Sequence, residues 1–226
     1  MESRAVIRAE GLEKVYGYGR NALTVLKGIS LDIGKGEIVS IVGPSGAGKS
    51  TLLNLIGCLD SFQGGRLSVM DKDVTNLSVE VLSGFRNRHI GFVFQLHNLL
   101  PEFTALENIM IPLMIRRVRR GHARGQALAL LDRFQIADRA HHKPSELSGG
   151  ECQRVAVARA IVGDPDIILA DEPTGSLDRA NSRMLTETLL ELGRQKGATI
   201  VIVTHDREIA SQTGKTISLV DGKIES

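Results

Sequence analysis

The chain has 226 residues, which at about 150 residues per domain corresponds to one large domain or one domain with a modest insertion. The 28 basic and 26 acidic residues leave a formal charge of +2, which excludes the strong global field of a nucleic-acid binder. Two widely separated cysteines, Cys58 and Cys152, exclude a disulfide framework and a cysteine zinc site, and they favour a reducing compartment. We expect neither a signal peptide nor a membrane span, because the first ten residues are charged and no run of about 18 uncharged apolar residues occurs.

Short β-branched runs alternate with longer helical patterns, which predicts an α/β fold with a mainly parallel core sheet and crossover helices. The runs are VIRAEGL near the start, LTVLKGISLDI at 23–33, EIVSIVG at 37–43, GFVFQ at 91–95, DIILAD at 166–171 and ATIVIVT at 198–204. Three are continuous enough to predict buried central strands. The first two, followed by the turn at 34–36, predict an antiparallel β subdomain, and TISLV-Asp221-Gly222-KIES predicts a C-terminal hairpin.

Between about 100 and 162 the strand pattern disappears, and three helical stretches follow one another: TALENIMIPLMI, HARGQALALLDRFQ and GGECQRVAVARAIV. This pattern predicts a helical subdomain inserted into the α/β core. No segment rich in proline or serine separates the two parts. We therefore expect residues 1–226 to form one domain with two lobes.

A glycine-rich loop directly follows one predicted strand and precedes the helical run TLLNLIGCL. It fits the pattern G-x-x-x-x-G-K-[S/T] with Gly43, Pro44, Ser45, Gly46, Ala47, Gly48, Lys49 and Ser50. In this context the backbone N–H groups and the helix N-terminus bind phosphates, the lysine reaches the β and γ phosphates, and the hydroxyl of Ser50 holds Mg²⁺. The loop therefore predicts a nucleoside triphosphate and Mg²⁺ as ligands.

Two further segments carry chemistry-bearing residues. Asp171 and Glu172 end an apolar strand, so Asp171 can serve the Mg²⁺ shell while Glu172 orients and deprotonates the attacking water. An Asp-Glu pair at such a position also occurs as a turn or helix cap. Leu147-Ser148-Gly149-Gly150-Glu151 has capping-box spacing, which fits either an ordinary capped helix or a helix N-terminus that binds an anion.

These motifs resemble, in order and over essentially the whole chain, those of the ABC-type ATP-binding cassettes. The resemblance rests on the phosphate loop, LSGGE, ILADE, Ser176-Leu177-Asp178 and the strand-terminal Thr204-His205-Asp206. It implies a P-loop ATPase that works as a homodimer, in which LSGGE contacts the ATP held by the other subunit. The implied partners are ATP and Mg²⁺.

The resemblance also implies individual roles. The nucleotide contacts would be Tyr16, Gly43, Pro44, Ser45, Gly46, Ala47, Gly48, Lys49, Ser50, Thr51, Ser148, Gly149, Gly150 and Asp178. The metal shell would include Ser50, Gln95 and Asp171, and the catalytic residues would be Glu172, His205, Gln95 and Lys49. Tyr16 would stack on adenine, although Tyr18 lies close enough in sequence to keep that assignment open.

The stretch from Gln95 to Asn108, with LLPEFTALEN at its centre, resembles the lipoprotein-releasing ATPases of this family. Macrolide-export and cell-division ATPases are the nearest relatives and give the alternative function. The resemblance implies peripheral attachment to the cytoplasmic face of the inner membrane, on two integral-membrane subunits, with no direct contact to the cargo. Leu99, Leu100 and Phe103 either line a groove for a short cytoplasmic helix or pack inside the helical subdomain.

Overall fold

The computed structural model describes residues 5–175 and 177–225, and their strands form two sheets. The smaller sheet is antiparallel, with β2 (Leu23–Gly34), β1 (Ala5–Tyr16), β4 (Gly64–Val69) and β5 (Lys72–Asp73) in that order. Burial alternates along β1, and the alternation shifts at a bulge around Gly11, where φ is +60°. The predicted antiparallel pairing of the first two strands is therefore confirmed.

The larger sheet forms the core and runs in the order β10 (Lys223–Glu225), β9 (Lys215–Val220), β3 (Ile38–Val42), β8 (Thr199–Val203), β7 (Ile167–Asp171) and β6 (Ile90–Val93). All its neighbouring strands pair in parallel except β10, which closes the predicted hairpin. Residues such as Ile41, Leu169 and Ile202 are fully buried. Burial on both faces explains why these strands read as continuous apolar runs.

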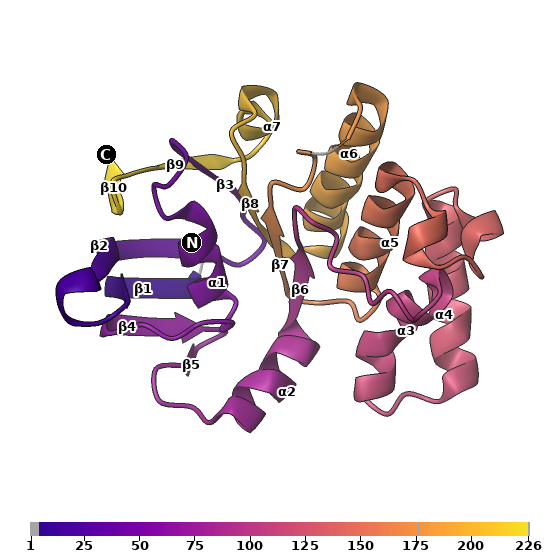
Figure 1. The fold of residues 1–226 in the computed structure, drawn as a ribbon, viewed down its shortest axis with the longest axis horizontal. Coiled ribbons are helices and arrows are strands. Elements are labelled where there is room, and N and C mark those ends of the chain that lie inside the picture. The colour runs from indigo at the N-terminus through magenta and orange to yellow at the C-terminus, as the bar shows by residue number, and fades with distance from the viewer. Residues whose placement is uncertain (1–4, 176, 226) are drawn as a thin grey trace.

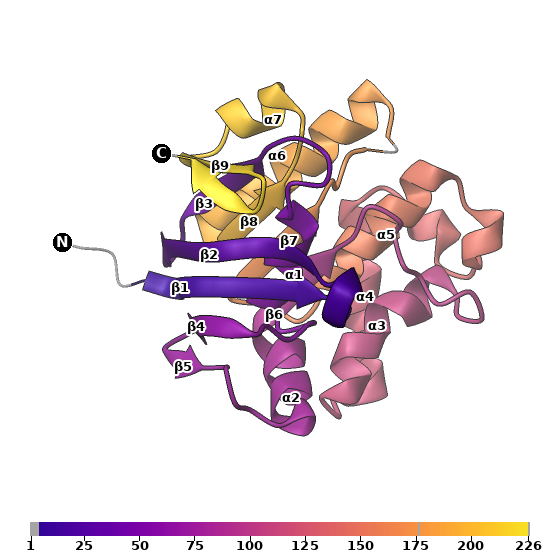
Figure 2. The same ribbon diagram turned by 60° about the vertical axis from the view of Figure 1, so that its left-hand side comes forward.

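Three helices lie between β6 and β7 in the chain: α3 (Ala105–Ile115), α4 (Arg120–Arg133) and α5 (Gly149–Ile161). Figure 1 and Figure 2 place them together at the end of the molecule opposite the antiparallel sheet. Most of their buried apolar side chains, including Ile109, Ala127 and Val157, belong to one apolar cluster that continues onto the core sheet through Ile168 and Ile200. The limits 100–162 of a separate subdomain stay a prediction.

The sequence pattern predicted no helix or strand in residues 60–90, yet this segment forms β4, β5 and α2 (Val79–His89). The strands escaped prediction because β4 begins with two glycines and β5 has two residues. Helix α2 buries only Phe85 and therefore lacks an apolar stripe, but Ser78 caps its start. The remaining helical elements are α1 (Lys49–Ile56), α6 (Arg179–Lys196), α7 (Arg207–Ser211) and the 3₁₀ turns Gly19–Asn21, Ala137–Arg139 and Pro144–Glu146.

Across the described ranges, none of the helices combines the length and the apolar character that a bilayer crossing requires.

Candidate active site

Four groups of predicted site residues come from the carboxyl ends of four adjacent parallel strands. The phosphate loop follows β3, and His205 follows β8. Asp171 ends β7, Glu172 comes directly after it, and Gln95 follows β6. These strands neighbour one another in the order β3-β8-β7-β6, so all four segments emerge at one edge of the sheet. This edge is where open α/β sheets bind ligands.

The phosphate loop is held by its own backbone and by the C-terminal hairpin. Gly43 has φ +151°, and a Cβ there would lie 2.0 Å from the Leu219 carbonyl oxygen, so only glycine fits. The Gly222 N–H donates to the carbonyl of Ala47 at 3.1 Å. Within the described part of the chain, no side chain caps the first turn of α1, which leaves its N–H groups for an anion. The loop geometry therefore fits a phosphate chain.

Lys49 and Ser50 open helix α1 beside this loop. The ammonium of Lys49 donates to the carbonyl oxygens of Gly43 and Pro44, each at 2.9 Å. Ser50 Oγ donates to Asp171 Oδ1 at 3.1 Å. Burial raises the pKa of Asp171, and nearby Glu172 adds to the rise, while Ser50 and Lys49 oppose it. A hydroxyl and a carboxylate in contact are the hard oxygen donors that Mg²⁺ prefers, so these residues fit the predicted metal.

Glu172 and His205, 33 positions apart in sequence, form a direct contact. His205 Nδ1 lies 2.9 Å from Glu172 Oε2, and the imidazole is largely exposed. Glu172 has φ +45°, a left-handed conformation that costs energy outside glycine and that clusters at functional sites. A Cβ built on Gly175 would lie 3.6 Å from Gln95 Nε2 and 3.8 Å from Glu172 Cβ, so the Gln95 side chain lies beside the same loop.

The side chain of Tyr16 is held by a hydrogen bond, whereas that of Tyr18 is almost fully exposed. The Tyr16 hydroxyl donates to Asp60 Oδ2 at 2.7 Å, and Lys14 Nζ lies 4.5 Å from the ring centroid while pairing with Asp60 Oδ1 at 2.8 Å. Burial, followed by the hydrogen bond to Asp60, raises the pKa of Tyr16. Tyr18 is 96% exposed, whereas Tyr16 keeps 41% of its surface accessible. Of the two tyrosines, Tyr16 is thus the one that a hydrogen bond and a cation–π contact hold in place.

Ser148 at LSGGE makes the predicted capping box. Its hydroxyl accepts from the Glu151 N–H at 3.3 Å, and Glu151 Oε2 accepts from the Ser148 N–H at 2.7 Å. Arg139 binds Glu151 at 2.8 Å, and this contact first, with the capping bond second, lowers the pKa of Glu151 to about 2. Among the described residues, no hydrogen bond or ion pair joins 148–150 to the phosphate loop.

Asp178 is the N-cap of helix α6, and its carboxylate accepts a hydrogen bond from the Asn181 N–H at 2.9 Å. Ser176, the first residue of the Ser-Leu-Asp motif, lies outside the described residues.

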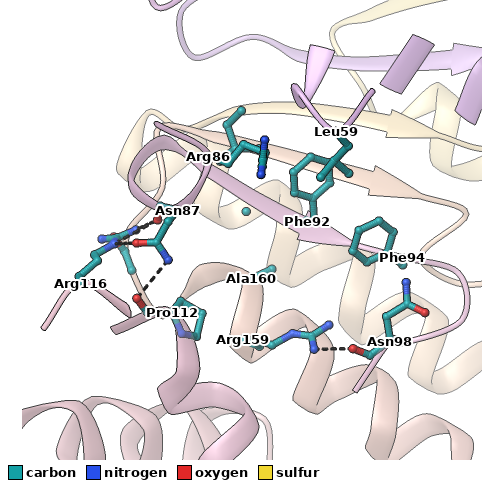
Figure 3. Close-up of a pocket in the computed structure, with 13 residues that line it drawn as sticks. Leu59, Arg86, Asn87, Phe92, Phe94, Asn98, Pro112, Arg116, Arg159 and Ala160 are labelled. Carbon is teal, nitrogen blue, oxygen red and sulfur yellow. Dashed lines mark hydrogen bonds between the residues drawn. The ribbon is translucent and has the colours of Figure 1, made fainter. Parts of the chain in front are cut away.

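A hollow of about 290 Å³ lies between α2, β6 and the ends of α3 and α5, and Phe94 and Asn98 of the segment that carries Gln95 line part of it (Figure 3). The Phe92 and Phe94 rings stack along one side, with centroids 5.4 Å apart. Arg116 and Arg159 border it. Of the predicted groove residues, Leu100 and Phe103 are more than 40% exposed, whereas Leu99 packs against the helical cluster.

Sequence reasoning missed three residues that support the site: Lys14, Asp60 and Gln153. Lys14 and Gln153 are almost or fully buried, at 4% and 0% exposure. Asp60 receives hydrogen bonds from both Lys14 and Tyr16. Lys14 and Gln153 could have been recognised in the sequence as polar side chains at inward positions of an apolar strand and an apolar helix.

Comparison with known proteins agrees with this geometry. The family model described as ABC transporter matches residues 26–175. A lipoprotein-releasing system ATP-binding protein LolD from Bacteroides fragilis (strain YCH46) is 53% identical over 219 residues, which cover 97% of this chain and 100% of that protein. A LolD protein from Geobacter metallireducens (strain ATCC 53774 / DSM 7210 / GS-15) is 50% identical, covering 97% of this chain and 98% of that protein.

Solved structures of known proteins also resemble this chain over nearly its whole length. A dimeric structure of the ATP-binding cassette MJ0796, in a post-hydrolysis state bound to ADP and Pi, superposes with a TM-score of 0.93 at 41% identity and covers 97% of both chains. The family match, the end-to-end similarity and the four strand-end motifs agree, and the chain belongs to the ABC transporter family as an ATP-binding cassette.

Proposed function

We propose that this chain is the ATPase subunit of a complex that releases lipoproteins from the inner membrane. The observation that carries the proposal is the near 50% identity, over almost the full length of both chains, to proteins named for that system. The strand-end site supports the ATPase part because it gathers the phosphate loop, a metal-binding pair and a Glu-His pair at one edge.

In the proposed reaction, Glu172 is the general base. Its carboxylate takes a proton from the attacking water, and His205, 2.9 Å away, holds the carboxylate in place. Gln95 lies beside the same loop and orients the water. Ser50 and Asp171 would hold Mg²⁺, which when bound neutralises charge on the phosphate oxygens. Lys49 exchanges two neutral carbonyl acceptors for charged phosphate oxygens, to which hydrogen bonds are about twice as strong.

The proposed working unit is a homodimer with two composite ATP sites. Residues Ser148 to Gly150 stand at a helix N-terminus that is not joined to the chain's own phosphate loop within the described residues. The solved cassette MJ0796 is itself a dimer. In such a dimer each LSGGE segment serves the nucleotide on the other subunit, so ATP favours closure by the difference in its affinity for the two states.

The hollow in Figure 3 is the proposed docking place for integral-membrane subunits. The stacked phenylalanines and the half-exposed Leu59 offer an apolar surface to the apolar face of a short helix. Docking there would place the chain peripherally on the cytoplasmic face of the inner membrane. The cargo would contact the membrane subunits and not this chain.

Tyr16→Ala is expected to weaken ATP binding by about tenfold, because a stacked base contributes about 1–3 kcal/mol. Tyr18→Ala is the matched control, since its ring is 96% exposed, and ATP affinity should stay within about twofold. Titration with a fluorescent ATP analogue measures both dissociation constants. A larger loss of affinity for Tyr18→Ala than for Tyr16→Ala would contradict the proposal and show that Tyr18 stacks on the adenine.

Affinity capture tests the proposed function as a whole. Tagged Glu172→Gln protein is incubated with detergent-solubilised native membranes, ATP and Mg²⁺, and the bound proteins are identified by mass spectrometry. Two related membrane subunits together with lipoproteins are the expected result. Recovery of a cell-division protein or a macrolide exporter would instead support the alternative, and a sample without nucleotide is the control.

A further inference from the structure

Helix α5 carries a fully buried amide at Gln153. The side chain is 0% exposed and follows the LSGGE cap at Ser148 by five positions. Its neighbours along the helix, Val155 to Ala158, are apolar and also fully buried. An amide at such a position costs free energy unless all its polar atoms are paired.

Both ends of this amide are paired, and the partners lie on two different loops of the active site. Gln153 Nε2 donates to the Pro173 carbonyl at 2.8 Å and to the Phe94 carbonyl at 3.4 Å. Gln153 Oε1 lies 2.5 Å from His97 Nδ1, and because a carbonyl oxygen only accepts, the imidazole donates. Phe94 and His97 flank Gln95 and its neighbour, whereas Pro173 directly follows Glu172.

The two loops need such support because each contains non-glycine residues in the left-handed region. His97 and Asn98 have φ +36° and +47°, and Glu172 has φ +45°. Arg159, further along α5, donates to the carbonyls of Asn98 at 2.6 Å and His97 at 2.8 Å, the first of which Figure 3 shows. Conformations of this kind persist only where the surroundings over-determine them.

We propose that Gln153 is a positioning residue for ATP hydrolysis, whose buried amide holds Glu172 and the Gln95 loop in fixed relation to the helix that begins at LSGGE. The inference rests on the proposed ATPase function and deepens it. It gives a direct connection between the helix end that meets ATP across the proposed dimer and the loop that carries the proposed base. Gln153 itself touches neither nucleotide nor water in this role.

Gln153→Met tests the proposal, because methionine keeps the side-chain length and a helical conformation but removes all three hydrogen bonds. We expect kcat for ATP hydrolysis by the full-length chain to fall by about tenfold while KM for ATP stays within about twofold. Misplacement of Glu172 slows the chemical step, whereas the phosphate loop that binds ATP is untouched. A steady-state assay well below the melting temperature of each variant gives both constants.

Val157→Ala is the matched control, since this side chain is fully buried one turn later on the same helix and contacts the apolar cluster. It should lower Tm with kcat within about twofold, because a buried truncation acts on stability. A kcat for Gln153→Met that matches this control would overturn the proposal.

His97→Ala provides a second, independent variant. It removes one of the three hydrogen bonds, so kcat should fall by about threefold with unchanged KM, and it should add less than about twofold in the Gln153→Met background. If Gln153→Met does not fold, an unchanged kcat in His97→Ala overturns the proposal. A wild-type chain that hydrolyses no ATP contradicts the proposed function instead, so the two failures are distinct.

Discussion

Glu172→Gln is expected to lower kcat for ATP hydrolysis by about 10²- to 10⁴-fold while ATP affinity stays within about twofold. The amide has the shape of the carboxylate and can still accept from His205, which lies 2.9 Å from Glu172 Oε2. It cannot accept the proton of the attacking water. The phosphate loop and the Ser50–Asp171 pair are untouched, so binding of ATP and Mg²⁺ persists.

Single-turnover hydrolysis and a nucleotide titration measure the two quantities separately. Glu191→Gln is the matched control, because this carboxylate forms an exposed ion pair with Arg133 at 3.4 Å and neither residue belongs to the proposed site. The control variant should change neither kcat nor ATP affinity. A Glu172→Gln variant that still hydrolyses ATP within about tenfold of wild type would assign the general base elsewhere.

The same variant reports on the dimer. With hydrolysis stalled, ATP and Mg²⁺ should hold two chains together, and light scattering should give twice the monomer mass of 24.5 kDa. Wild-type protein without nucleotide is the comparison. A monomeric mass for Glu172→Gln in saturating ATP and Mg²⁺ would contradict the composite-site proposal while leaving the assignment of Glu172 intact.

Much of the core could be predicted from the sequence because its strands are buried on both faces. The runs ending at Val42, Asp171 and Val203 are apolar and short, and each ends in a segment with a recognisable motif. The order of these strands in the sheet could not be derived in the same way. Placing β3 between β9 and β8 depends on contacts between residues more than 150 positions apart in the chain.

The site was predictable to the extent that its residues occur in spaced motifs. Spacing locates Lys49 and Ser50 within a few residues of one another, and the structure adds that Ser50 meets Asp171, 121 positions away. The residues that support the site from behind, such as Gln153, do not occur in a spaced motif of this kind. Gln153 is conspicuous only as an amide among apolar neighbours, and its partners at Pro173 and His97 are set by tertiary packing.

Lys49→Ala is expected to weaken ATP binding by about 100-fold. This substitution should act on the affinity for ATP, whereas Glu172→Gln should act on the rate of hydrolysis. Two charge-assisted hydrogen bonds to phosphate oxygens, at about 1.5 kcal/mol each, correspond to this factor. Among the residues that the structure describes, the ammonium donates hydrogen bonds to the carbonyls of Gly43 and Pro44 and to no other group. Those carbonyls belong to an open loop that water reaches after truncation, so the fold should lose little stability.

Isothermal titration with ATP and Mg²⁺ measures the loss, and Lys35→Ala is the matched control. Lys35 is exposed in the turn between β2 and β3, and its removal subtracts the same charge without touching the phosphate loop. Unchanged affinity in the control separates a local contact from a general change in protein charge, which salt screens beyond about 10 Å. Equal affinity for wild type and Lys49→Ala would remove the lysine from the phosphate site and leave the backbone N–H groups of the loop as its main anion-binding element.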